Sequence, residues 1–198
     1  MKRNATISGL RNPNRSYSFT INNVELSETN ISSLIKIVSA LTPREELFLG
    51  FYKSDGFYLS KSEHRKYKKE IFEFFKNNGN YTELIERQSE HISLLKSDRE
   101  LIGCKISVDI NTNSFSDIFK KICLSYLETI IFCPNIDWDE FIQSYKNYTS
   151  INVTDYVIKG YTDFLFSYTD SSDFSITFNP NLYDILLVRK LIETYWTI

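Results

Sequence analysis

Cysteine, glycine and histidine are scarce in this sequence of 198 residues, with three, six and two copies respectively. Cys104, Cys123 and Cys133 are odd in number and form no CxxC spacing, so a reducing compartment is favoured over a disulfide framework or a zinc ribbon. The few glycines form no phosphate-binding or nucleophile-elbow motif. His64 and His91 lie outside any HExxH motif and are interpreted as structural. On these grounds no cofactor is expected.

Long apolar stretches are also missing. No uninterrupted apolar run approaches the roughly 18 residues that a membrane-spanning helix requires. The segment 1–15 has four basic residues but no apolar stretch, so it does not resemble a secretory signal. We expect a soluble, cytoplasmic protein in which this segment is a flexible basic arm, with a short strand near Thr6–Ser8. No Pro/Gly/Ser-rich linker divides the remainder, so residues 16–198 are predicted to form a single α+β domain.

The charges are unevenly distributed, although the net charge is only −2. Residues 1–121 carry a net charge of +4, whereas residues 122–188 hold two lysines against nine acidic residues, a net charge of −7. Such asymmetry indicates a surface that attracts a partner of the opposite sign. The pI near 5.8 argues against nucleic acid as that partner. The acidic segment therefore predicts a basic protein.

Hydrophobic periodicity predicts an α+β fold with a mostly antiparallel sheet. Alternating residues predict a strand at Ser16–Ile21. A second strand is expected at Ile102–Ile110, and its period of two should bury Ile106 and Val108 and expose Lys105 and Asp109. The C-terminal part predicts a three-stranded meander, with strands at Val153–Lys159, Tyr161–Tyr168 and Phe174–Phe178.

About five to seven helices are expected to pack on this sheet. The apolar face of 116–132 is the widest, so this helix is predicted to be the central one. The last helix is predicted to begin at Pro180 and to turn Leu182, Ile185, Leu186, Ile192 and Tyr195 inward. The other helices are expected at about 31–41, 42–54, 60–77, 82–95 and 137–148.

The run Asp137-Trp138-Asp139-Glu140 is the densest acidic cluster. Three carboxylates in four residues suit Mg²⁺, which prefers oxygen ligands, and would serve a metal-dependent hydrolase or nuclease. Acids in the first turn of a helix also complement its dipole, and Asp137 suits the N-cap. Successive helical residues point in different directions, so the capping interpretation is preferred and no metal site is assigned.

The acidic segment is also rich in aromatic residues, and some of these are expected in the core. Tyrosine and tryptophan beside carboxylates are typical of protein-recognition surfaces, where aromatics act as anchors and acids steer a basic partner. The sequence therefore favours a non-catalytic protein-binding protein, as an immunity protein or antitoxin masks a nuclease toxin. A solvated acidic surface without a partner is the plainer alternative. The predicted binding residues are Asp137, Trp138, Asp139, Glu140, Tyr145, Tyr148, Asp155, Asp163, Asp170 and Asp173.

Overall fold

The structure of the protein is a computed structural model. The described residues are 6–11, 16–25, 27–42, 46–54, 69, 73, 81–88, 99–107, 128–147, 154–169 and 173–196.

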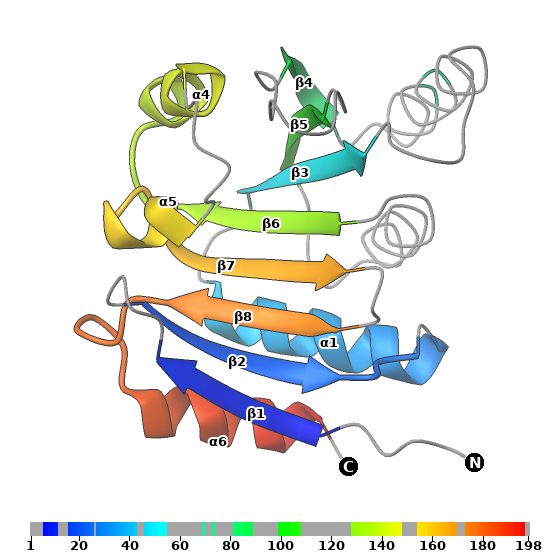
Figure 1. The fold of residues 1–198 in the computed structure, drawn as a ribbon, viewed down its shortest axis with the longest axis vertical. Coiled ribbons are helices and arrows are strands. Elements are labelled where there is room, and N and C mark those ends of the chain that lie inside the picture. Colours follow the sequence, from blue (N-terminus) through cyan, green and yellow to red (C-terminus); the bar gives the residue numbers. More distant parts are fainter. Residues whose placement is uncertain are drawn as a thin grey trace.

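One antiparallel sheet of eight strands organises these residues, in the order β1-β2-β8-β7-β6-β3-β5-β4 (Figure 1). Every neighbouring pair is antiparallel. The strands are β1 Thr6–Arg11, β2 Tyr17–Asn22, β3 Glu46–Ser54, β4 Tyr81–Gln88, β5 Arg99–Ser107, β6 Glu128–Pro134, β7 Thr162–Thr169 and β8 Phe174–Phe178. Four helices are described, namely α1 Glu28–Leu41, α4 Trp138–Asn147, α5 Thr154–Ile158 and α6 Ile185–Tyr195. The predicted α+β fold is confirmed, while the count of five to seven helices stays a prediction.

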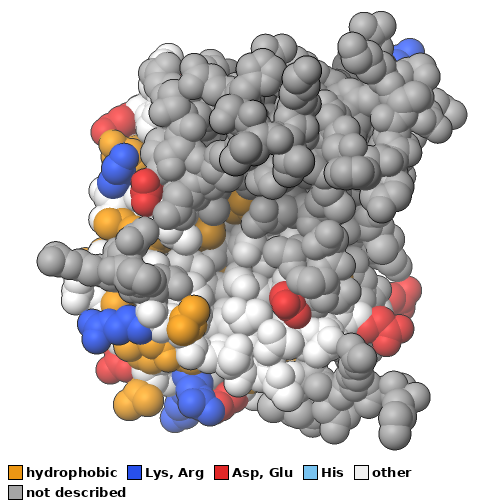
Figure 2. Space-filling view, in the orientation of Figure 1, with side chains coloured by type: hydrophobic (Ala, Val, Ile, Leu, Met, Phe, Trp, Pro, Cys, Tyr) orange, Lys and Arg blue, Asp and Glu red, His pale blue; other side chains and the backbone are white. Residues whose placement is uncertain are grey.

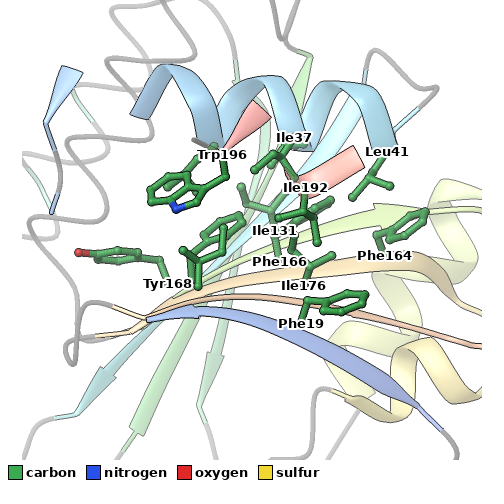
Figure 3. Close-up of a cluster of buried hydrophobic side chains, with 14 of the residues drawn as sticks. Phe19, Ile37, Leu41, Ile131, Phe164, Phe166, Tyr168, Ile176, Ile192 and Trp196 are labelled. Atoms are coloured by element: carbon green, nitrogen blue, oxygen red, sulfur yellow. The ribbon is translucent and has the colours of Figure 1, made fainter. Parts of the chain in front are cut away.

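The main core lies between one face of the sheet and the helices α1 and α6, which are behind β1, β2 and β8 in Figure 1. Alternation along the strands directs every second side chain towards these helices. Figure 3 shows strand side chains such as Phe19, Phe166 and Ile176 meeting Ile37 of α1 and Ile192 of α6. Each of these five side chains is at most 2% exposed, and full burial of such a side chain contributes about 1.5–3 kcal/mol.

A second core lies on the opposite face, beneath α4 and α5. On β6, Ile131 faces the main core while Ile130 and Phe132 face this second cluster, as a period of two requires. Phe132 meets Phe141 of α4 and Tyr156 of α5 at ring-centroid distances of 5.7 Å and 5.3 Å. The two helices are therefore attached to the sheet through aromatic contacts.

Hydroxyl groups cover this opposite face where the described helices do not. Ser18 and Thr20 of β2 hydrogen-bond Thr177 and Ser175 of β8 across the strands, at 2.8 Å and 3.0 Å. Figure 2 shows this part of the molecule as a largely white area with few charged or apolar side chains. The sheet thus has one apolar face and a second face that is polar over β2 and β8.

Several predicted elements are confirmed. Strands β2, β7 and β8 lie where alternation placed them, and β5 overlaps the strand expected from Ile102. Helix α1 ends at Leu41 as expected, and the short strand expected near Thr6–Ser8 is part of β1. The turn after β2 places Asn23 at φ 58°, a left-handed conformation that asparagine tolerates. The predicted burial of Ile106 and Val108 and exposure of Lys105 and Asp109 concern side chains that lie outside the described residues.

Four predicted elements are wrong, because short apolar runs do not distinguish helix from strand. Within the helices expected at 42–54 and 82–95, residues 46–54 form β3 and residues 82–88 belong to β4, while 43–45 and 89–95 lie outside the described residues. Residues 128–132 of the predicted central helix belong to β6, and the remainder of that helix lies outside the described residues. The strand expected at Val153–Lys159 is instead the helix α5, so that β6 is the first strand of the meander β6-β7-β8.

The last helix is shorter than predicted and is rotated. It begins at Ile185 after the N-cap Asp184, whose carboxylate accepts hydrogen bonds from two backbone N–H groups. Leu182, Leu186 and Tyr195 were predicted to face inward, but they are exposed. The N-cap lies four residues after Pro180, so Leu182 precedes the helix, whereas Ile185 and Ile192 pack against the main core as predicted. In the helix predicted at 60–77, only Lys69 and Glu73 are described, and both are helical.

Candidate functional site

The end of the sheet where β6 stops and β7 starts carries most of the predicted binding residues. Backbone N–H of Cys133 donates to Oγ1 of Thr162 at 2.8 Å, and that hydroxyl donates to the carbonyl of Phe164 at 2.8 Å. Two residues after Cys133, N–H of Asn135 donates to the carbonyl of Tyr161 at 3.3 Å. These bonds hold the segment that leads from β6 into α4 against the start of β7.

Asn135 also joins the two acidic parts of this region. Its side-chain Nδ2 donates to Oδ1 of Asp163 at 2.9 Å. Asp163 is the second residue of β7, whereas Asn135 lies two residues before Asp137. The hydrogen bond therefore brings the carboxylate of Asp163 next to the acidic start of α4, although β7 and the start of α4 are far apart in sequence.

Asp137 caps α4, as the sequence predicts. Its Oδ1 accepts hydrogen bonds from the backbone N–H of Asp139 at 2.9 Å and of Glu140 at 3.5 Å, and its carbonyl accepts from Phe141. Asp137, Asp139 and Glu140 are all exposed. Three negative charges at the N-terminus of a helix are stabilised by the helix dipole, which allows them to lie close together.

Trp138 lies between the core and the surface. It is half-buried and contacts Phe141 edge to face, with ring centroids 6.0 Å apart. Phe141 in turn is fully buried and contacts the tilted ring of Tyr156 of α5, with centroids 5.7 Å apart. The indole is therefore held by the second core and remains partly exposed.

A Schellman motif ends α5 and fixes Tyr161 beside this region. N–H of Tyr161 donates to the carbonyl of Tyr156 at 2.8 Å, and N–H of Gly160 donates to that of Val157 at 3.2 Å. Gly160 has φ 75°, which other residues adopt only with strain. The rings of Tyr156 and Tyr161 are 5.9 Å apart and form the apolar contact usual in this motif.

The structure thus gathers six of the ten predicted binding residues at one end of the sheet. Figure 2 shows acidic side chains along its left margin, at the level of α4 and α5 in Figure 1. The exposed Lys159 is a basic side chain at the same end. We call this region the acidic end, and it comprises Asp137, Trp138, Asp139, Glu140, Asp155 and Asp163, with Asn135 and Tyr161.

The other predicted residues do not join the acidic end. Asp173 accepts a hydrogen bond from N–H of Asn23 at 3.1 Å, at the far end of the β7-β8 hairpin. The length of β7 separates it from Asp163 by roughly 20 Å. Tyr148, Asp170 and the side chain of Tyr145 lie outside the described residues. Several aromatics of the acidic segment are in the cores and are not available to a partner, namely Phe141, Tyr156, Phe164, Phe166 and Tyr168.

Two residues of the acidic end were not predicted. Asn135 carries no signal of its own in the sequence, because its role depends on the pairing of Pro134 with Thr162. Tyr161 has a detectable signal, since a glycine directly before an aromatic residue at a helix end is consistent with a Schellman motif. That signal was hidden because the preceding residues were assigned to a strand.

The described residues contain no group of three or more His, Cys, Asp or Glu side chains placed to hold a metal ion. Cys133 is 3% exposed and belongs to the main core, while Cys123, His64 and His91 lie outside the described residues. No described helix is long and apolar enough to cross a membrane. No family model, curated protein or solved structure matches the chain.

Proposed function

We propose that this protein acts by binding another protein at the acidic end and not by catalysis. One observation supports the proposal most strongly: Asp137, Asp139 and Glu140 are exposed around a half-buried Trp138, and Asn135 brings Asp163 to the same place. Carboxylates around an aromatic anchor are a combination suited to a basic protein surface.

The two kinds of side chain would have different tasks. The carboxylates would attract a basic partner over distances of about a Debye length, roughly 8–10 Å in physiological salt, and would raise the association rate. Trp138 would then be desolvated in the complex and would slow dissociation. Because Phe141 and the second core hold the indole, little conformational entropy would be lost when the partner binds.

A more specific form of the proposal is an inhibitor of the immunity-protein or antitoxin type, which masks a basic toxin. It rests on the −7 charge of residues 122–188 and on the absence of a catalytic motif in the sequence. Such a protein would need only a rigid acidic surface, and the caps of α4 and α5 supply the rigidity.

The test is affinity capture from the native host followed by binding measurements on the captured protein. Asp137→Asn/Asp139→Asn removes two charges but leaves the cap of α4 in place, because asparagine caps helices as well as aspartate does. Glu25→Gln/Glu28→Gln is the matched control, since it removes two exposed carboxylates near Asn23, at the end of β2 remote from α4. The first variant should bind the partner at least about tenfold more weakly at low salt, and the second should bind normally.

The enzyme alternative gives the opposite pattern. A metal-dependent hydrolase would lose turnover in Asp139→Asn, and the substitution would not affect a protein complex. Failure to capture any partner, together with Mg²⁺-dependent hydrolysis that Asp139→Asn abolishes, would overturn the proposal.

A further inference from the structure

Strand β1 forms one edge of the sheet. It pairs with β2, and no strand in the described part of the chain lies on its other side. Five of its six residues are exposed. Edge strands in most proteins are blocked by lysine, proline or a bulge, but Thr6–Arg11 contains neither residue and pairs with β2 without a register shift. The outward N–H and C=O groups of β1 can therefore accept another strand.

Exposed leucines accompany this edge. Arg11 pairs with Tyr17, and Tyr17 pairs with Phe178, so the end of β1 and the end of β8 lie at the same end of the sheet. The chain passes from there into α6. Figure 2 shows apolar and basic side chains at the lower left, where β1 ends and α6 begins in Figure 1. The exposed leucines lie on both faces here: Leu10, the register partner of Ser18, is on the hydroxyl-bearing face, whereas Leu182, Leu186 and Leu187 lie before or on α6, which covers the other face. We call these four residues the leucine patch, and their exposed fractions are 65% for Leu10, 62% for Leu182, 76% for Leu186 and 67% for Leu187.

The charge of the edge is positive. Residues 1–15, which contain β1, carry four basic and no acidic side chains, and Arg11 is exposed at the end of the strand. On α6 the exposed side chains include Lys190 and Arg189, the latter with its Nε 2.8 Å from Oε1 of Glu193. The hydrogen bond and the charge of Glu193 raise the pKa of Arg189 above its ordinary value. The acidic side chains here are Glu193, which pairs with Arg189, and the N-cap Asp184, so Arg11, Arg189 and Lys190 provide three positive charges against two negative ones.

We propose that β1 and the leucine patch bind an extended, acidic segment of another protein, which adds to the sheet as a further strand. Backbone hydrogen bonds to β1 would provide affinity, and alternate side chains of the segment would contact Leu10 on one face and Arg11 and the start of α6 on the other. A second copy of this chain fits less well, because it would present an edge of the same positive charge. The proposal concerns a surface distinct from the acidic end and does not depend on the proposed function.

The probe is a fluorescent, end-capped octapeptide that alternates glutamate with valine, measured by anisotropy. The first control is the same peptide with alternate backbone nitrogens methylated on the edge that would face β1. We expect the methylated peptide to bind about tenfold or more weakly, because it cannot donate hydrogen bonds to the strand. Hydrogen exchange should show added protection within residues 6–11 when the unmodified peptide binds.

Variants of the protein complete the test. Arg11→Gln should weaken binding about fivefold, whereas Lys36→Gln, which removes an exposed positive charge from α1, should not. Leu10→Asn should weaken binding without loss of folding because Leu10 is exposed. Asp137→Asn/Asp139→Asn should bind the octapeptide normally, so failure of this proposal is distinguishable from failure of the proposed function. Absence of peptide binding, equal affinity for the methylated peptide, or dimerisation through residues 6–11 in sedimentation experiments would overturn it.

Discussion

The acidic end and the β1 edge differ in how they present a surface to a partner. At the acidic end, side chains carry the charge, and caps and hydrogen bonds such as that between Asn135 and Asp163 fix their positions. At the β1 edge, the backbone is the exposed feature, and Arg11 and the leucine patch lie beside it. Both surfaces lie at the same end of the sheet, because Arg11, Tyr17, Phe178 and Phe164 are successive register partners, so one end offers two surfaces of opposite charge on strands that different segments of the chain supply.

The two regions also depend on different cores. The acidic end rests on the second core, in which Phe132, Phe141 and Tyr156 form mutual ring contacts. The β1 edge rests on the main core, through the partly buried Ile7 and Tyr17. Damage to the second core should therefore affect the acidic end first, and this expectation allows the regions to be separated by substitution.

The largest effect is expected from Phe141→Ala. The side chain is fully buried, so its loss should lower the free energy of unfolding by about 3–5 kcal/mol through lost burial and an unfilled cavity. Urea denaturation measures this value. If the variant stays folded, the octapeptide should still bind at β1 while partner binding at the acidic end is reduced. A loss below about 1 kcal/mol would show that α4 is not anchored as described.

A smaller effect is expected from Gly160→Ala. No atom lies within 4 Å of the added methyl group, so the cost arises from φ 75° alone and should be about 1–2 kcal/mol. Thermal or urea unfolding measures it, with Asn23→Gly as a control that should be close to neutral at φ 58°. An unchanged stability in Gly160→Ala would contradict the Schellman motif at the end of α5.

Removing the cap of α4 should cost slightly less. Asp137→Ala should lower stability by about 1 kcal/mol, since the N–H groups of Asp139 and Glu140 lose their acceptor. Asp184→Ala is the equivalent change at α6 and should cost a similar amount. If Asp137→Ala were neutral while Asp184→Ala was not, Asp137 would not act as a cap.

The smallest effect on stability is expected from removing charge alone. Asp137→Asn/Asp139→Asn should change the free energy of unfolding by no more than about 0.5 kcal/mol, because both side chains are exposed and the cap is kept. A larger loss would indicate that these carboxylates serve the fold. A loss of about 0.5 kcal/mol or less would mean that the carboxylates are not needed for stability. The acidic end would then differ from the two cores, whose side chains are needed for it.

The sequence predicts those elements whose pattern is unambiguous. Alternation in β2 and β8, the aromatic run of β7 and the helical spacing in α1 correctly locate four elements of the main core. The apolar runs of β3, β4 and β6 do not distinguish strand from helix, and β6 is buried on both faces, with Ile131 in the main core and Ile130 and Phe132 in the second. The acidic start of α4 and its cap are visible in the sequence, whereas the contribution of Asn135 appears only when β6 and β7 are paired.

The exposed leucines of α6 illustrate why surface features are harder to predict. Pro180 suggests a helix start, but the N-cap is Asp184, so Leu182 lies before the helix, and α6 turns Val188 and Ile192 inward. Leu186 lies on the outside although its residue type favours the core. The sequence pattern therefore missed the leucine patch, which depends on how α6 packs on the sheet.

The most direct test of the account is the association rate of the captured partner at low and high salt, measured by stopped-flow fluorescence. Wild type is compared with Asp137→Asn/Asp139→Asn and with the control Glu25→Gln/Glu28→Gln. We predict that the wild type and the control associate about tenfold faster at low salt than the acidic-end variant, and that high salt removes the difference. Equal rates for all three proteins at low salt would contradict a role of the acidic end in binding.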